Sequence, residues 1–144
     1  MSDTPNTQTQ QKPGLMSRPI PAPMVSVETK PFWDAAAEGR FLIGRCHDCG
    51  KAYWYPRNTC PHCLSGNTSL EESPGEGVIY TYSVMYRSPT GPYAIGYVTL
   101  NEGPAVLTNF VDVAPDGLAI GMRVKVKFQD TEGGGPPAPV FAPA

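Results

Sequence analysis

Hydrophobic and polar residues alternate along the second half of the chain, a pattern typical of half-buried strands. Residues 78–87 divide into two faces, one with Val78, Tyr80, Tyr82, Val84 and Tyr86 and the other with Ile79, Thr81, Ser83 and Met85. Further strands are predicted over 93–100, 105–111 and 123–128, with a last short one at Val140 and Phe141. Five short strands separated by Gly-containing turns predict a small closed or partly closed barrel over 73–144, an OB-fold in preference to a sandwich.

A short helix is predicted over 29–39, ahead of the strands. Thr29 suits the N-cap, Pro31 the first turn and Gly39 the left-handed end of such a helix. Phe32 and Trp33 lie at its start. These two rings either pack against the body of the protein or contact a partner or ligand. With only this helix, the chain is predicted to be mainly β.

Residues 1–28 are rich in Pro, Thr and Gln and show neither a helical nor a strand period. Such a stretch buries too little apolar surface to offset its ordering entropy, so we expect a flexible tail, or an arm that orders on a partner. The N-terminus lacks the features of a secretory signal, and no apolar run reaches the ~18 residues of a membrane span. We therefore expect a cytoplasmic protein with no membrane partner.

Composition narrows the classes of function. The 144 residues include 11 Lys+Arg and 13 Asp+Glu, which gives a net charge of −2. Proteins that neutralise many phosphates usually carry a basic excess, so a nucleic-acid partner is disfavoured. The 15 glycines and 17 prolines leave little length for helices, in agreement with short strands joined by turns.

Four cysteines form a C-x2-C-x10-C-x2-C pattern over residues 40–72, made of Cys46, Cys49, Cys60 and Cys63. Each pair can wrap two thiolates around one ion, and two pairs supply a tetrahedral S4 site. Such a site accepts zinc or iron. Zinc is favoured, because Leu64 follows the second pair where a rubredoxin carries Gly. With four protein ligands the ion has no open position, so it is predicted to be structural.

Catalytic machinery is hard to find in the remaining residues. His47 and His62 lie between paired cysteines and are expected to be exposed turn residues. Glu71 and Glu72 are expected in a linker between the cysteine-containing segment and the barrel. No nucleophile with a nearby base and no phosphate-binding loop is recognisable, so the chain is not expected to be an enzyme by itself.

The tyrosines of the predicted strands leave two readings open. Tyr80, Tyr82, Tyr86, Tyr93 and Tyr97 are either core and cross-strand packing or a stacking face for bases or sugars. The second reading supports an alternative function, a single-stranded nucleic-acid-binding module. A rubredoxin-like electron carrier is a further, weaker alternative.

The order of motifs resembles a known family. A helix with Pro31-Phe32-Trp33 precedes the cysteine segment, and Gly75-x-Gly77, Gly96-Tyr97-Val98-x-Leu100 and the ending Pro139-Val140-Phe141-Ala142-Pro143 follow. This arrangement is similar to the proteins with a rubredoxin-like zinc ribbon and an OB-fold, long filed as domain of unknown function thirty-five. The resemblance covers about residues 30–143.

The resemblance implies a non-catalytic accessory subunit. Members of the family assemble with thiolase-superfamily enzymes, or with hydratases and aldolases that process acyl-CoA in aromatic and steroid degradation. It implies a structural zinc, and a CoA thioester only as a ligand shared with the partner. From the residues themselves, the cations Lys30, Arg57 and Arg87 are candidate contacts to CoA phosphates, since the guanidinium groups of the two arginines bind phosphate well. Phe32 and Trp33 are candidate contacts to a partner or ligand.

Overall fold

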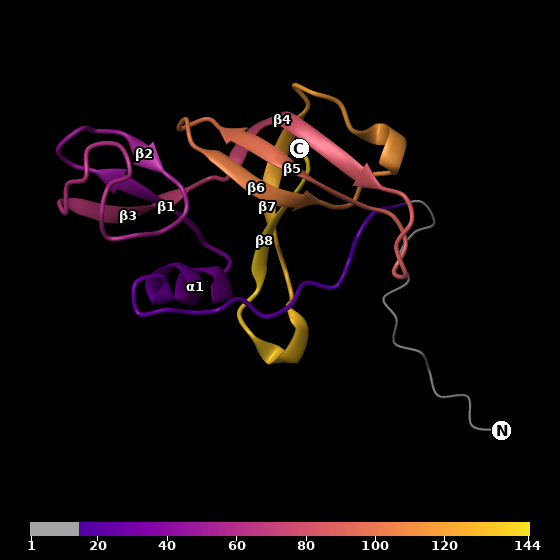
Figure 1. The fold of residues 1–144 in the computed structure, drawn as a ribbon, viewed down its shortest axis with the longest axis horizontal. Helices are drawn as coiled ribbons and strands as arrows, with labels where there is room; N and C mark the ends of the chain where they lie inside the picture. The colour runs from indigo at the N-terminus through magenta and orange to yellow at the C-terminus, as the bar shows by residue number, and fades with distance from the viewer. Residues whose placement is uncertain (1–14) are drawn as a thin grey trace.

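A computed structural model describes residues 15–144 of the chain (Figure 1). After a short helix, α1 (Lys30–Ala37), three strands form an antiparallel sheet in the order β2-β1-β3. These are β1 (Phe41–Cys46), β2 (Ala52–Tyr53) and β3 (Thr68–Ser73). Gly44 of β1 lies opposite Tyr53 of β2, and its missing side chain makes room for the Tyr53 ring. We call this unit, residues 40–73, the ribbon.

Five further strands close into a barrel, as the sequence predicts, and their order around it is β4-β5-β6-β8-β7. Only the β6–β8 contact is parallel. The barrel strands are β4 (Glu76–Met85), β5 (Tyr93–Leu100), β6 (Ala105–Phe110), β7 (Arg123–Gln129) and β8 (Ala138–Pro143). Two short 3-10 turns, η1 (Pro115–Gly117) and η2 (Glu132–Gly134), lie on either side of β7. The closing contacts are short, because β4 pairs with β7 over residues 76–78 and β6 meets β8 at the Phe110–Phe141 pair.

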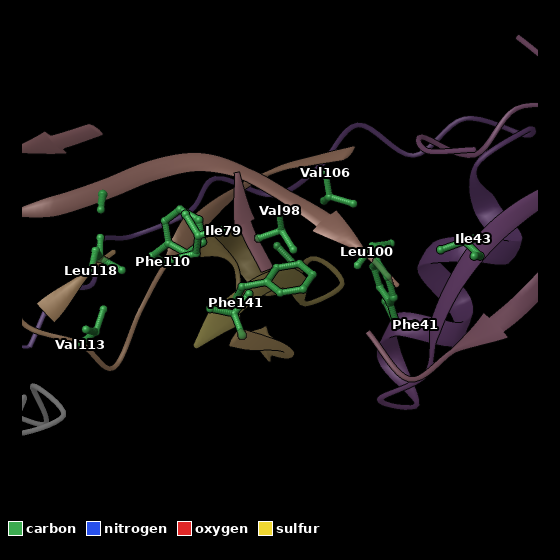
Figure 2. Packing of buried hydrophobic residues seen from close by; sticks show 14 of the residues in the cluster. Phe41, Ile43, Ile79, Val98, Leu100, Val106, Phe110, Val113, Leu118 and Phe141 are labelled. Carbon is green, nitrogen blue, oxygen red and sulfur yellow. The ribbon is translucent and has the colours of Figure 1, made fainter. Parts of the chain in front are cut away.

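One hydrophobic core runs through both units (Figure 2). In the barrel it contains fully buried side chains of β4, β5, β6 and β8, such as Ile79, Val98 and Phe141. It continues into the ribbon through Phe41 of β1, whose ring centroid lies 6.2 Å from that of Phe32 on α1. Phe32 and Trp33 are 0% and 7% exposed, so the helix is held by packing. Of the two readings for these rings, burial in the body of the protein is the one observed.

The segment expected to link the ribbon to the barrel is instead a strand. Glu71 and Glu72 lie in β3, which pairs with all six residues of β1. The sequence Thr68–Ser73 has no clear apolar alternation, and its inward face holds only Leu70 as a large apolar side chain. Pairing with β1, rather than local pattern, makes this segment a strand.

The faces predicted for β4 are correct only in part. A bulge between Ile79 and Thr81 shifts the register against β5. Ile79 is buried on one side of the bulge, whereas Tyr82 and Val84 turn inward beyond it. A bulge inserts one residue into the strand and so exchanges the two faces. Tyr80, at the bulge, is consequently 68% exposed.

Residues 15–22, part of the segment predicted to be a flexible tail or a partner-binding arm, contact the chain's own barrel, whereas residues 24–28 are exposed. Met16 is 1% exposed in the core, and its N–H donates to the carbonyl of Val113 at 2.9 Å. Arg18 lies over the ring of Tyr93, 4.0 Å from its centroid. The remainder of the predicted tail, residues 1–14, lies outside the described residues. None of the described helices is long and apolar enough to cross a membrane.

Met16→Ala should lower the free energy of unfolding by about 2 kcal/mol, because a buried methionine side chain is lost from the barrel core. Chemical denaturation of the full chain measures the change. Met24→Ala is the matched control, since Met24 is 94% exposed and its removal should change stability by less than about 0.5 kcal/mol. Equal stabilities of the two variants would contradict the docking of this segment.

Candidate metal centre and the cavity beside it

The four cysteines come from two similar turns of the ribbon. Cys46 ends β1 and Cys49 lies in the turn that follows, where the N–H of Gly50 donates to the Cys46 carbonyl at 3.0 Å. The second turn repeats this bond from Leu64 to the Cys60 carbonyl at 2.9 Å. Leu64 takes a left-handed conformation with φ 65°, and Gly50 does so with φ 77°.

The sulfur atoms of these cysteines all lie within 4.8 Å of one another. Cys46 Sγ is 3.5 Å from Cys63 Sγ, and Cys49 Sγ is 3.7 Å from Cys60 Sγ. A tetrahedral zinc ion with bonds of ~2.3 Å would separate its sulfur ligands by about 3.8 Å. The donor set therefore fits a structural metal ion of the kind that thiolates bind. All four predicted ligands lie together.

Backbone N–H groups point at the inner sulfurs. The N–H of Cys49 donates to Cys46 Sγ at 3.4 Å, and the N–H of His62 donates to Cys60 Sγ at 3.3 Å. Mainly through the Cys49 N–H, this environment lowers the pKa of Cys46 to about 7. The Ser65 N–H lowers the pKa of Cys63. The hydrogen bond between the side chains of Cys63 and Cys46, together with burial, has a larger opposite effect, so the pKa of Cys63 is raised to about 12. Four thiolates this close need a cation to neutralise them.

Neither histidine belongs to the sulfur cluster. His47 Nε2 lies 2.7 Å from Ser69 Oγ on β3, and His62 Nε2 lies 3.3 Å from the carbonyl of Ala52. Both residues are exposed, as the sequence predicts. Asp48 instead connects the two turns, because it accepts hydrogen bonds from the Ser65 hydroxyl and, at 3.0 Å, from Asn67 Nδ2. These bonds, the Ser65 hydroxyl first, lower the pKa of Asp48.

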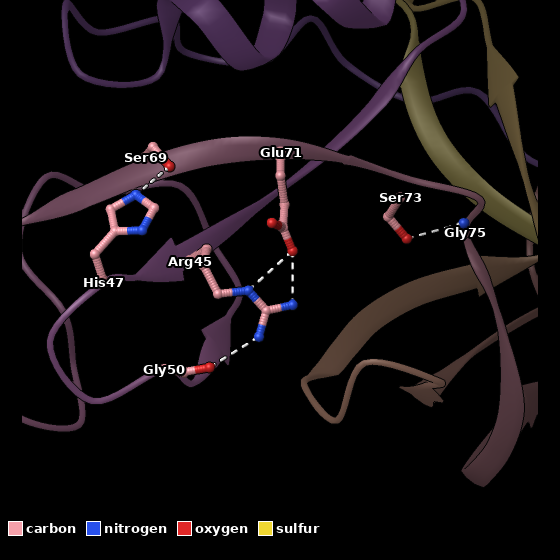
Figure 3. Close-up of polar contacts among 7 residues, drawn as sticks. All are labelled: Arg45, His47, Gly50, Ser69, Glu71, Ser73 and Gly75. Carbon is pink, nitrogen blue, oxygen red and sulfur yellow. Dashed lines mark hydrogen bonds and ion pairs between the residues drawn. The ribbon is translucent and has the colours of Figure 1, made fainter.

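An ion pair between Arg45 and Glu71 braces β1 against β3 (Figure 3). Arg45 donates to Glu71 Oε1 from Nη2 at 2.6 Å and from Nε at 3.0 Å, and its Nη1 donates to the Gly50 carbonyl at 2.9 Å. The hydrogen bond to Glu71 raises the pKa of Arg45. All the guanidinium nitrogens of Arg45 are thus engaged within the ribbon.

A cavity of about 670 Å³ lies where the ribbon meets the β5–β6 turn of the barrel. Its ribbon side includes the cations Lys51 and Arg57 together with Tyr53 and Trp54. The barrel side is the turn at residues 102–105, where Glu102 Oε1 is buried and accepts no hydrogen bond within the described residues. Besides Arg45, which is paired with Glu71, the cavity therefore offers the two cations Lys51 and Arg57, two aromatic rings and one carboxylate acceptor.

The structure separates the residues predicted to contact CoA. Arg57 lines the cavity just described. Lys30 and Trp33 line a second one of about 490 Å³ beside α1, where Lys30 Nζ pairs with Asp34 at 2.7 Å. Arg87 lies exposed after β4, and Phe32 is fully buried.

Sequence reasoning missed four of the cavity residues named above, which are Lys51, Tyr53, Trp54 and Glu102. No local signal marks them, because the cavity forms only when the ribbon packs against the β5–β6 turn.

Comparisons with known proteins agree with this architecture. A cysteine ribbon joined to a closed five-stranded barrel defines a zinc-ribbon and OB-fold protein. Residues 33–69 match the family model described as "ChsH2, rubredoxin-like zinc ribbon domain", and residues 70–129 match "ChsH2, C-terminal OB-fold domain". The chain belongs to this ChsH2 (DUF35) family, which confirms the resemblance stated from the sequence.

Among curated relatives, a "Probable enoyl-CoA hydratase alpha subunit" of Thermomonospora curvata is 34% identical over 95% of this chain. The chain spans 43% of the length of that relative. A "DUF35 domain-containing scaffold protein" of Methanocaldococcus jannaschii is 37% identical over 67% of this chain and 74% of its own length.

Two solved structures are also similar. The one titled "Ltp2-ChsH2(DUF35) aldolase" matches with a TM-score of 0.73 and 33% identity, over 84% of this chain and 98% of that chain. A DUF35 protein of unknown function from Sulfolobus solfataricus has a TM-score of 0.59 over 83% of this chain and 87% of its own. At 16% identity, the second likeness concerns the fold alone.

Cys60→Ser should lower the affinity for the metal by more than about 100-fold, because changes even beyond the ligands cost 10- to 100-fold. Elemental analysis of the purified protein measures the loss, and the wild type should hold one zinc ion per chain and be colourless. His47→Gln is the control and should keep its metal. A red ferric protein would overturn the zinc assignment, and full metal content in Cys60→Ser would overturn the ligand set.

Proposed function

We propose that this protein is a non-catalytic accessory subunit of a cytoplasmic CoA-thioester-processing complex, docked on a catalytic subunit of the thiolase superfamily. The names of its relatives support an enzyme partner: one is a probable enoyl-CoA hydratase alpha subunit, others are scaffold proteins, and one solved relative is titled an aldolase. A hydratase or an aldolase is therefore the alternative partner. The reaction belongs to aromatic, steroid or related acyl-CoA degradation.

The reactive side chains of the described residues, the cysteines and histidines, are engaged within the ribbon, and this supports the proposal most directly. All four cysteines are in one sulfur cluster, and it is the one metal-ligating group found among residues 15–144. Both histidines make contacts within the ribbon, to Ser69 and to Ala52. A nucleophile needs an activating base in hydrogen-bond reach, and these residues are held in other roles. The chemistry is accordingly assigned to the partner.

The cavity between ribbon and barrel is the part of this chain best suited to share a CoA thioester. Phosphate groups would meet Lys51 and Arg57, and a pantetheine amide N–H could donate to Glu102 Oε1, a buried acceptor. Tyr53 and Trp54 add apolar surface. Of the CoA contacts expected from the sequence, Arg57 is retained, whereas Lys30 and Arg87 are better explained by surface and partner contacts.

Single-stranded nucleic acid is the weaker candidate. Tyr80 and Tyr86 are 68% and 66% exposed, so two rings are free to stack on bases. However, β5, one neighbour of β4 in the barrel, carries no cation to neutralise phosphates. On β7, the other neighbour, Lys125 and Lys127 already pair with Glu76 and Asp112. The affinity for an oligonucleotide should therefore be low. It should fall with salt concentration no more steeply than the affinity of an inert acidic protein does.

Affinity purification of the tagged full chain from its source cells should recover a thiolase, hydratase or aldolase subunit in near-equal amount. Mass spectrometry identifies the subunit, and cells expressing the tag alone provide the control. A chain that elutes as a monomer with no acyl-CoA enzyme would overturn the proposed function. Recovery of nucleic acid instead would favour the alternative.

Arg57→Gln should raise the Kd of the purified complex for its acyl-CoA about three- to fivefold, because an exposed charge contact is worth up to about 1 kcal/mol. Calorimetric titration of the complex measures the change. Arg123→Gln is the control, since Arg123 lies exposed on β7 and outside the cavity. Equal affinities in the two variants would exclude a CoA contact at Arg57.

A further inference from the structure

Three barrel strands, β4, β5 and β6, are adjacent (Figure 1). Their outward side chains include several large apolar ones and, after Glu76, no charged one. Antiparallel pairing places Thr81 beside Tyr97 and Tyr97 beside Leu107, so these three form one row across the strands. The next row contains Ser83, Ile95 and Asn109. We define the β4–β6 face by the large exposed apolar side chains on these strands, which are Tyr80, Met85, Ile95, Tyr97 and Leu107.

Exposure of these side chains is high for their type. Leu107 is 58% exposed, Met85 is 49% and Tyr97 is 43%. They are the outward half of an alternation whose inward half, including Ala94, Val98 and Val106, is the barrel core. Clustered apolar side chains of this kind on a soluble domain mark an interaction surface more often than single exposed ones do.

Charged residues are confined to other parts of the barrel. Neither β5 nor β6 contains an Asp, Glu, Lys or Arg, and β4 has none after Glu76. By contrast, β7 exposes Arg123, Lys125 and Lys127. The face thus contains Tyr and Met and no charged residue. The centres of protein interfaces have the same composition, because Tyr and Met are enriched there and charged residues are depleted.

Within residues 15–28, the N-terminal segment covers one end of this surface. Arg18 donates from Nε to Asn109 Oδ1 at 2.7 Å and stacks on Tyr93. Gln129 holds that position by donating to the Arg18 carbonyl at 2.8 Å. Arg18 thus stands as a fixed cation at the border, while the row of Tyr97 and Leu107 stays exposed. An apolar centre with a charged border is the arrangement expected of an interface core and its rim.

We propose that the β4–β6 face is the docking surface for the catalytic subunit of the acyl-CoA enzyme, and that the matching patch on that subunit is apolar and free of charge. A charged partner surface would leave its charges buried without counterions on these strands, which is costly. The phosphates of a nucleic acid would meet the same cost on this face. This inference rests on the proposed function, which supplies a second, different chain as the occupant.

Leu107→Arg tests the proposal, because it places an unpaired cation at the centre of the face. Tagged full-length chains are expressed in the source cells, and the co-purified acyl-CoA enzyme subunit is quantified. Its recovery should fall at least about tenfold, as expected for a central interface position. Ile120→Arg is the matched control, since Ile120 is 73% exposed but lies outside these strands, and it should keep the partner. Circular dichroism melting verifies that both variants fold.

Site-specific photo-crosslinking gives a second measurement that does not depend on the stability of a variant. A photoreactive residue at position 107 or 97 should form an adduct with the acyl-CoA enzyme subunit, and one at position 120 should not. Wild-type recovery of the partner with undiminished recovery by Leu107→Arg overturns the docking surface and leaves the proposed function standing. An adduct with a second copy of the chain also overturns it. Absence of any acyl-CoA enzyme from the wild-type purification defeats the proposed function itself.

Discussion

The edge-to-face contact between Phe41 and Phe141 joins the ribbon to the barrel. Their ring centroids are 6.3 Å apart and the rings are 2% and 0% exposed, so the core is continuous across the two units. A three-stranded ribbon of this size cannot bury enough apolar surface to be stable alone. It depends on its cysteine cluster at one end and on these aromatic contacts, with Phe32 of α1, at the other. The contact also fixes the position of the ribbon relative to the β5–β6 turn.

That fixed placement divides the surface into regions of different chemistry. The ribbon contributes Lys51 and Arg57 to the cavity, and β7 is basic on its outer side. The β4–β6 face, which Leu107 typifies, has no charge. An apolar interface and a cationic cavity cannot occupy the same residues. A subunit that bound an enzyme and also shared an anionic thioester, as proposed, would therefore need these two regions to be separate.

How much of this the sequence reveals depends on whether a feature is local. Cysteine spacing determines the ligand set, and alternation determines most barrel strands, because both act over a few residues. β3 is different: Glu71 becomes part of a strand only by pairing with β1 and Arg45. The bulge at Tyr80 exchanges the faces of β4 without any local mark in the sequence. Met16 gives no periodic signal either, since it and Ile20 are isolated apolar residues in a Pro-rich stretch that pack against the core.

The cysteine turns also form part of the cavity wall. Pro61 and His62 lie between Cys60 and Cys63, Gly50 and Lys51 directly follow Cys49, and all four residues line the cavity. A metal ion at the sulfur cluster would therefore hold these side chains in place without meeting the ligand. Because small metal sites couple ion binding to folding, losing the ion would disorder the ribbon side of the cavity and spare the barrel side at Glu102. If the cavity holds the thioester as proposed, a metal centre that is structural in its coordination would also support the geometry of that binding.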